Sequence, residues 1–278
     1  MPMPIASLTD RAVLALTGDD APGFLQGLIT CNVETLPPDE ARLGALLAPQ
    51  GKILFDFLLS RAGDGFHLDA PRAVLPDLMR RLTLYRLRAR VAFAQTPLRV
   101  FAAWGAEPEG SWLRDGRLPA LGWRLYAPEG GEPAVDATPE AFQAHRIALG
   151  VPESGADFAL GDAFPHEALM DQLGGVDFRK GCYVGQEVVS RMQHRGTART
   201  RVVPLLYPGA AVPAGTPVTA GARALGQTGS AAGDRGLGLL RLDRLADAVA
   251  AGERVEAGGL SVRVAKPDFV TFEVPGAA

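Results

Sequence analysis

One segment, Glu167–Thr197, gathers more kinds of side-chain chemistry than the packing of a core requires. Its centre, Lys180–Glu187, reads Lys-Gly-Cys-Tyr-Val-Gly-Gln-Glu and holds a cation, a thiol, a phenol, an amide and a carboxylate. Gly181 and Gly185 allow the backbone to bend or to approach a ligand closely. The segment therefore predicts a tight, exposed turn that carries a site, rather than a buried strand.

Length and composition indicate a globular protein with more than one domain. The chain has 278 residues, enough for two or three domains. Hydrophobic residues make up 47% and charged residues 21%, and the net charge of −3 gives no general attraction to nucleic acid. No apolar run reaches the roughly 18 residues that a membrane span needs.

The first residues and the two cysteines indicate the cellular compartment of the protein. Met1-Pro2-Met3-Pro4 lacks the basic region and the apolar core of a signal peptide. Cys31 and Cys182 stand 151 positions apart and do not form a disulfide framework. We therefore expect a cytoplasmic protein with free thiols.

The first ninety residues predict an alternation of strands and helices. Expected strands cover residues 13–16, 43–47, 53–60 and 66–69, with turns at Pro49-Gln50-Gly51 and Asp64-Gly65. Asp19 and Asp20 offer helix caps to a helix that runs to about Ile29, and Pro71 opens a second helix to about Tyr85. This order is typical of an α+β fold.

After residue 95 the predicted secondary structure changes twice along the chain. Short strands are expected over 98–126, a helix capped by Thr138 follows to Leu149, and 150–181 reads as ordered loop before a helical stretch at 186–191. After about residue 201, recurring turns and Val, Ala and Gly predict a small antiparallel β-barrel. We expect α+β parts over 1–95 and 96–200 that exchange segments, the second carrying the motif, and a barrel over 201–278.

The motif also carries a family resemblance. Lys180–Glu187, followed by a basic Arg195-Gly196, resembles the signature of the YgfZ family, folate-binding proteins linked to iron–sulfur cluster assembly and repair. That family is related to the glycine-cleavage T-protein, an aminomethyltransferase. Further matching segments are Phe24–Thr30, Pro49–Lys52, Tyr85–Val91 and Leu121–Arg124.

The resemblance implies a fold, a cofactor and partners. The fold would be two interlocked α+β folate-binding domains of T-protein type plus the C-terminal barrel. The ligand would be tetrahydrofolate or a derivative, and the partners would be iron–sulfur assembly proteins and client enzymes, without nucleic acid or membrane. The residues implied in cofactor binding are Lys180, Gly181, Tyr183, Gly185, Gln186, Glu187, Gln50 and Arg124.

Cys182 is the candidate reactive group. A lone cysteine is commonly a small buried apolar residue, but Lys180 and Arg179 nearby favour a thiolate at Cys182. We interpret Cys31, which follows an apolar helix, as structural. A cluster usually takes four thiolates, and His67, His145, His166 and His194 do not pair at metal-ligand spacing. No resident metal is therefore expected, and Cys182 is a possible transient ligand.

Two charged features leave alternatives open. Asp56 interrupts an apolar strand and shares a face with Leu54 and Leu58, so it is paired or faces a cavity. The T-protein resemblance also makes it a candidate catalytic residue, although Phe55 stands where the T-protein has an adjacent aspartate. The arginines at 80, 81, 86, 88 and 90 form either a solvated helix face or an anion site for a folate glutamate tail or a polynucleotide.

Three functions follow from these features. The first is a tetrahydrofolate-binding accessory factor for iron–sulfur enzymes, without classical turnover. The second is a folate-dependent aminomethyl or one-carbon transferase that uses Asp56. The third is a folate-linked factor for tRNA modification. Nucleotide-driven and serine-hydrolase functions are unsupported, because neither a phosphate-binding glycine loop nor a nucleophile elbow is present.

Overall fold

A computed structural model describes residues 3–277, and the chain divides into two compact units. The first unit combines the chain up to Phe142 with Leu173–Gln186, and the second combines Gln143–Gln172 with the chain from Glu187 onward. The motif is thus returned to the N-terminal unit from far along the sequence. The predicted three-part division at residues 95 and 200 stays a prediction. Met1 and Pro2, used above for the signal-peptide argument, lie outside the described residues.

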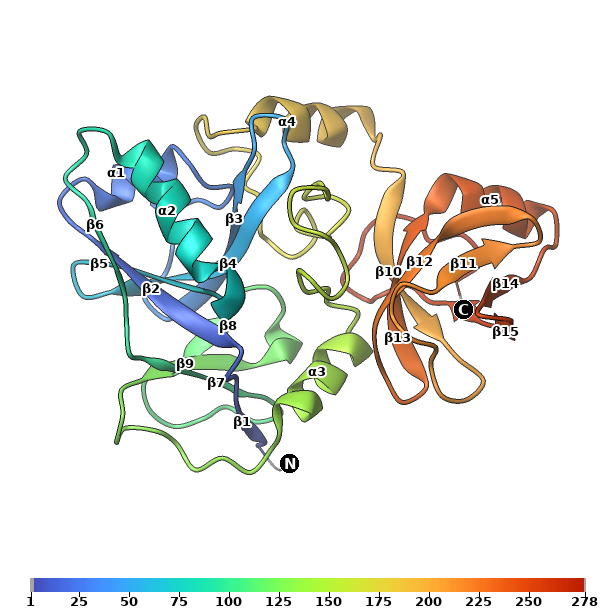
Figure 1. Ribbon diagram of the computed structural model, residues 1–278, viewed down its shortest axis with the longest axis horizontal. Coiled ribbons are helices and arrows are strands. Elements are labelled where there is room, and N and C mark those ends of the chain that lie inside the picture. The colour runs from blue at the N-terminus through green and yellow to red at the C-terminus, as the bar shows by residue number, and fades with distance from the viewer. Residues whose placement is uncertain (1–2, 278) are drawn as a thin grey trace. The chain divides into compact units, whose positions relative to one another are not determined.

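The first unit is built on a nine-stranded sheet with the order β1-β7-β9-β8-β3-β4-β5-β2-β6 (Figure 1). Neighbouring strands pair antiparallel throughout the described sheet, except that β3 and β8 run parallel. The strands are β1 (Ile5–Ser7), β2 (Arg11–Thr17), β3 (Glu40–Leu47), β4 (Ile53–Ala62), β5 (Gly65–Pro71), β6 (Ala92–Gln95), β7 (Arg99–Ala103), β8 (Leu113–Asp115) and β9 (Trp123–Ala127).

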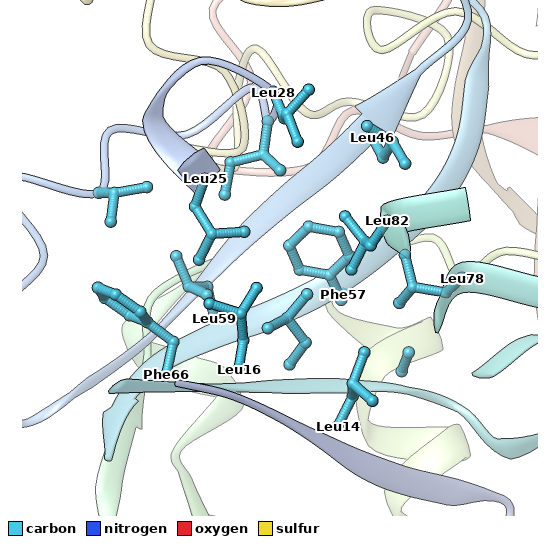
Figure 2. Close-up of a cluster of buried hydrophobic side chains, with 14 of the residues drawn as sticks. Leu14, Leu16, Leu25, Leu28, Leu46, Phe57, Leu59, Phe66, Leu78 and Leu82 are labelled. Atoms are coloured by element: carbon cyan, nitrogen blue, oxygen red, sulfur yellow. The ribbon is translucent and has the colours of Figure 1, made fainter. Parts of the chain in front are cut away.

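Helices α1 (Ala21–Gln26) and α2 (Leu75–Arg86) contribute to the main core of this unit. Leu78 and Leu82 lie four residues apart, on one face of α2, and both are fully buried. Figure 2 shows them beside Phe57 of β4 and above Leu14 of β2. Burying each such leucine contributes roughly 1.5–3 kcal/mol, so this apolar face fixes α2 on the sheet.

Both helices are shorter than the sequence predicts. Helix α1 ends at Gln26, with Gly27 as its C-cap residue, and does not reach Ile29. The Asp20 side chain makes no cap hydrogen bond, and its carboxylate accepts one from the Arg90 backbone N–H at 2.7 Å instead. Helix α2 starts at Leu75, because residues 72–74 form a separate 3-10 turn.

The second unit contains a seven-stranded antiparallel sheet with the order β15-β14-β11-β12-β13-β10-β16. Its strands are β10 (Thr200–Leu206), β11 (Pro217–Ala220), β12 (Arg223–Ala232), β13 (Arg235–Arg241), β14 (Val255–Ala257), β15 (Leu260–Ser261) and β16 (Arg263–Val264). Helix α5 (Leu242–Ala250), which the sequence prediction missed, buries Leu245 and Ala248 against this sheet. The α+β class and the antiparallel C-terminal sheet are confirmed.

Two further helices cross the boundaries between the units in sequence. Helix α3 (Pro139–Ala148) follows Thr138, whose hydroxyl accepts a hydrogen bond from the Ala141 N–H as expected. Helix α4 (Gln186–Arg195) begins within the motif. Within residues 3–277, no helix combines the length and the apolar character of a membrane span.

Candidate functional site

The motif is joined to the loop that follows α1. The Thr30 hydroxyl donates to the Gly175 carbonyl at 2.5 Å, and the Asp177 N–H donates to the Thr30 carbonyl at 3.0 Å. The Asn32 amide then donates to the Asp177 carboxylate at 3.1 Å. These bonds connect segments 145 to 147 positions apart, so the approach to the motif is fixed by the N-terminal unit itself.

Lys180 is the strongest of these attachments. Its side-chain amine donates to the carbonyls of Ile29 and Cys31, each at 2.7 Å, and only 7% of the residue is exposed. Burial lowers the pKa of Lys180 from 10.5 to about 8, although the neighbouring Cys31 and Asp177 act in the opposite direction. The residue expected to tune Cys182 thus directs its hydrogen bonds to the backbone around Cys31.

A second attachment, Tyr183, directly follows Cys182. The Tyr183 ring is buried, with its centre 5.4 Å from the Lys180 amine. Burial raises the pKa of the Tyr183 hydroxyl to about 12. The Gln186 side-chain oxygen accepts from the Tyr183 N–H at 3.3 Å, and Val184 packs against the main core. Gln186 therefore orders the motif backbone.

Gly185 brings the motif against the turn between β3 and β4. Its φ is +81°, and a Cβ placed on it would lie 2.5 Å from the Ala48 carbonyl oxygen and 3.2 Å from Gly51. No side chain fits there, because backbone atoms occupy the space. The structure therefore brings together Gly185 and the turn that holds Gln50, whose side chain is exposed.

Between the two attachments the chain is open. We call Lys180–Tyr183 the thiol arch, because its ends are buried while Gly181 and Cys182 are exposed. A Cβ on Gly181 would meet no atom within 4 Å. The arch displays one thiol to solvent on a backbone that is held on both sides.

Cys31 has the opposite environment. It is fully buried, and burial raises the pKa of its thiol to about 11 in spite of the nearby Lys180 and Arg42. A Cβ on Gly44 would lie 2.7 Å from its sulfur, so the thiol fills a gap in β3 packing. The two cysteines thus divide into one that packs and one that can react.

Arg124, implied in cofactor binding, lies in a buried charged cluster. Its guanidinium is 3.4 Å from the Asp115 carboxylate and stacks over the Phe142 ring at 4.8 Å. Asp115 is also bound by Arg117 at 2.7 Å. Burial lowers the pKa of Arg124. The contacts of Arg124 are to this cluster and differ from those of the thiol arch.

Glu187, also implied in cofactor binding, lies on the outer side of α4. Its side chain is 85% exposed and pairs with Arg191 at 2.6 Å, one helical turn later. Such exposed pairs contribute little to stability. The carboxylate is accessible to solvent.

Asp56 lies on the face of the sheet opposite the main core. It is half-buried and sits across from Ala45, while Phe55 and Phe57 on either side contact the core. Two positions further along β4, Leu58 faces Asp69 of β5. Asp56 is thus on the same face of the sheet as a buried carboxylate.

Asp69 anchors a polar cluster that sequence reasoning missed. Its carboxylate accepts from Arg11 at 2.5 Å and from the Tyr126 hydroxyl at 3.3 Å, and it is fully buried. Burial raises the pKa of Tyr126 well above 10. The signal in the sequence was a charged residue inside the apolar strand that follows Asp64-Gly65, the same signal that singled out Asp56.

A cavity of about 540 Å³ lies next to the residues that lead into the arch. Asn32, Arg42 and Asp177 supply its polar wall, while Phe178 and Arg179 bring it to within one residue of Lys180. Asn32 and Asp177 were not predicted as site residues, because their partnership joins distant segments. Across residues 3–277 no group of three or more His, Cys, Asp or Glu side chains is placed to hold a metal ion.

Comparison with known proteins defines the class first. The whole chain resembles the crystal structure of glycine cleavage system aminomethyltransferase T from Bartonella henselae, with a TM-score of 0.77 over 99% of this chain and 88% of that one. At 18% identity this similarity shows the fold, and it confirms the predicted T-protein architecture. Residues 199–272 match the family described as CAF17, C-terminal beta-barrel domain. The protein therefore has the aminomethyltransferase fold with a CAF17-type barrel.

The curated relatives define the family. The chain is 32% identical to the human iron–sulfur cluster assembly factor IBA57, over 86% of this chain and 77% of the relative. The IBA57 homologue of Pyricularia oryzae is also 32% identical, over 90% and 75% of the two chains. The Chaetomium globosum homologue is 32% identical over 74% of this chain, which spans only 57% of that longer relative. This chain belongs to the IBA57 family.

The same relatives correct one prediction. All three are named as mitochondrial proteins, which contradicts the cytoplasmic location expected from the sequence. The prediction was wrong because free cysteines indicate a reducing compartment without saying which one.

Proposed function

We propose that this protein takes part in iron–sulfur cluster assembly, with Cys182 as the thiol that contacts the cluster. The observation that carries the proposal is the exposed Cys182 held between the buried side chains of Lys180 and Tyr183. The names of the IBA57 relatives and the YgfZ-like motif support the same role. The partners would be iron–sulfur assembly proteins and the enzymes that receive clusters.

The chemistry is ligand exchange on a cluster that is cargo. Cys182 loses its proton to solvent, and its thiolate forms one Fe–S bond. A thiolate of the donor or of a small thiol leaves that iron and takes up a proton, so no electron is transferred. Because clusters usually take four thiolates, the other ligands come from a partner or from small thiols. The fixed arch keeps the entropy cost of presenting Cys182 low.

Anaerobic reconstitution tests this proposal. The full chain is incubated with ferrous iron, sulfide and glutathione, desalted, and assayed for iron, sulfide and visible absorption. We expect wild-type protein to retain a cluster and Cys182→Ala to lose it. Cys31→Ala is the matched control and should retain the cluster, because the Cys31 thiol is buried. Equal retention by wild type and Cys182→Ala would rule out the cluster role of this thiol.

We further propose that tetrahydrofolate or a derivative is a ligand of the protein. The support is the aminomethyltransferase fold and the motif resemblance. Calorimetric titration under anaerobic conditions tests it. A micromolar dissociation constant would correspond to a binding free energy of about −8 kcal/mol. We expect wild type and Cys182→Ala to bind alike. Absence of binding by both would remove the folate proposal and leave the cluster proposal to its own test.

A further inference from the structure

The end of α2 carries apolar side chains that the described chain leaves uncovered. Leu84 is 67% exposed and Leu87 is 89% exposed, the highest values among the large hydrophobic residues of the described chain. Arg81, Arg86 and Arg88 lie within three residues of them in the sequence and are exposed as well. We call these five residues, Arg81, Leu84, Arg86, Leu87 and Arg88, the Leu84–Arg88 surface.

Helical geometry places Leu84 away from the protein. Leu82 faces the main core, and two residues further along a helix correspond to a rotation of about 200°. Leu84 therefore points outward, and the helix ends two residues later at Arg86. The core does not account for the apolar character of this side.

The arginines of this surface are available for a partner. Arg81, Arg86 and Arg88 make no ion pair within residues 3–277, whereas Arg80 pairs with Asp77 and Arg90 with Asp19 and Asp20. The chain as a whole has a net charge of −3, so this is a local positive patch on an acidic protein. A ligand for the patch is expected to be anionic.

The backbone at Leu87 adds an independent observation. Its φ is 45° and its ψ is −107°, a region that residues with a side chain rarely adopt. Glycine would adopt it with less strain. An exposed leucine in strained backbone gains nothing from folding that offsets the strain, so its side chain is better explained by contact with another molecule.

We propose that the Leu84–Arg88 surface binds an acidic segment of a partner protein. An apolar side chain of that segment would cover Leu84 and Leu87, and its carboxylates would pair with Arg81, Arg86 and Arg88. The leucines favour protein over polynucleotide, because a phosphate backbone gives little apolar area to bury against them. They favour protein over an anionic membrane, because the apolar face of α2 is buried in the main core and two exposed leucines offer little area for insertion into a bilayer.

A labelled helical peptide provides the test. It carries two leucines four residues apart, flanked by glutamates, and binding to the full chain is followed by fluorescence anisotropy. We expect saturable binding that weakens about tenfold or more in Leu84→Ser/Leu87→Ser and in Arg86→Glu/Arg88→Glu. The matched controls are Leu260→Ser and Arg235→Glu/Arg263→Glu, exposed positions on the barrel, which should change the affinity less than about twofold.

Leu87→Gly separates binding from folding. Relief of backbone strain should raise the melting temperature while peptide affinity falls. The proposal is overturned by equal binding of a glutamate peptide without leucines, by unchanged affinity in both double variants, or by no saturable binding. Tighter binding of single-stranded RNA or of phosphatidylglycerol vesicles than of the peptide would also overturn it.

Discussion

At the scale of single residues, the site sets a buried cation beside an exposed thiol. Lys180 satisfies two backbone carbonyls of a loop about 150 positions away, and Cys182 stands two residues further in solvent. The motif's lysine therefore acts as an anchor, and its contribution is measurable as stability.

Replacing Lys180 by methionine should destabilise the protein by about 1–3 kcal/mol, because the carbonyls of Ile29 and Cys31 stay buried without their donor. Urea unfolding measures the change. Arg179→Met, an exposed neighbour, is the control and should stay within about 0.5 kcal/mol. Equal values for the two variants would contradict the anchoring role.

The same residue predicts a pH dependence of stability. Its pKa is about 8 in the folded protein and 10.5 ordinarily, so above pH 8 the unfolded chain holds the proton that the folded chain has released. The contribution of Lys180 to the free energy of unfolding therefore rises with pH, by at most about 1.4 kcal/mol per pH unit. The buried Cys31 thiol opposes this rise in both proteins, because it keeps its proton in the folded chain and loses it in the unfolded one. Between pH 8 and 9 the slope of stability against pH should therefore be more positive in wild type than in Lys180→Met. A Lys180→Met slope equal to wild type would refute this assignment.

At the scale of elements, the motif packs against the turn between β3 and β4. Gly185 touches the turn through backbone atoms, whereas Gly181 faces open space. Close packing therefore requires glycine at position 185 but not at position 181.

Gly185→Ala should cost about 1–3 kcal/mol, because a Cβ meets the Ala48 carbonyl and the residue keeps a positive φ. Gly181→Ala should change the free energy of unfolding by less than about 0.5 kcal/mol. Chemical denaturation of both variants checks the difference. If both glycines tolerate alanine alike, the close packing of the motif on the turn is refuted.

Local sequence signals predicted the elements well and the long-range pairings poorly. The Pro49-Gln50-Gly51 turn and the Thr138 cap depend on neighbouring residues, so their patterns could be interpreted directly. Helix α5 was missed because Ala and Val in a strand-rich region fit either structure. The pairing of Lys180 with Ile29 has no local pattern, so the sequence identified Lys180 as important without its partner.

At the scale of the whole molecule, the fold is an aminomethyltransferase architecture in which segments are exchanged between two units. The motif enters the first unit through Leu173–Gln186 and leaves it as α4 begins. Identity to IBA57 factors over most of the chain shows the family, and structural similarity to aminomethyltransferase T shows the fold.

Complementation by Cys182→Ala in cells that lack this gene tests directly whether the exposed thiol is needed for the protein's role. The activity of iron–sulfur enzymes is measured, with the abundance of each variant checked by immunoblot. Gly181→Ala is the control, because it alters the arch without removing the thiol. We predict that Cys182→Ala accumulates normally and fails to restore those activities, whereas Gly181→Ala restores them. Full restoration by Cys182→Ala would contradict the central claim that this thiol performs the protein's function.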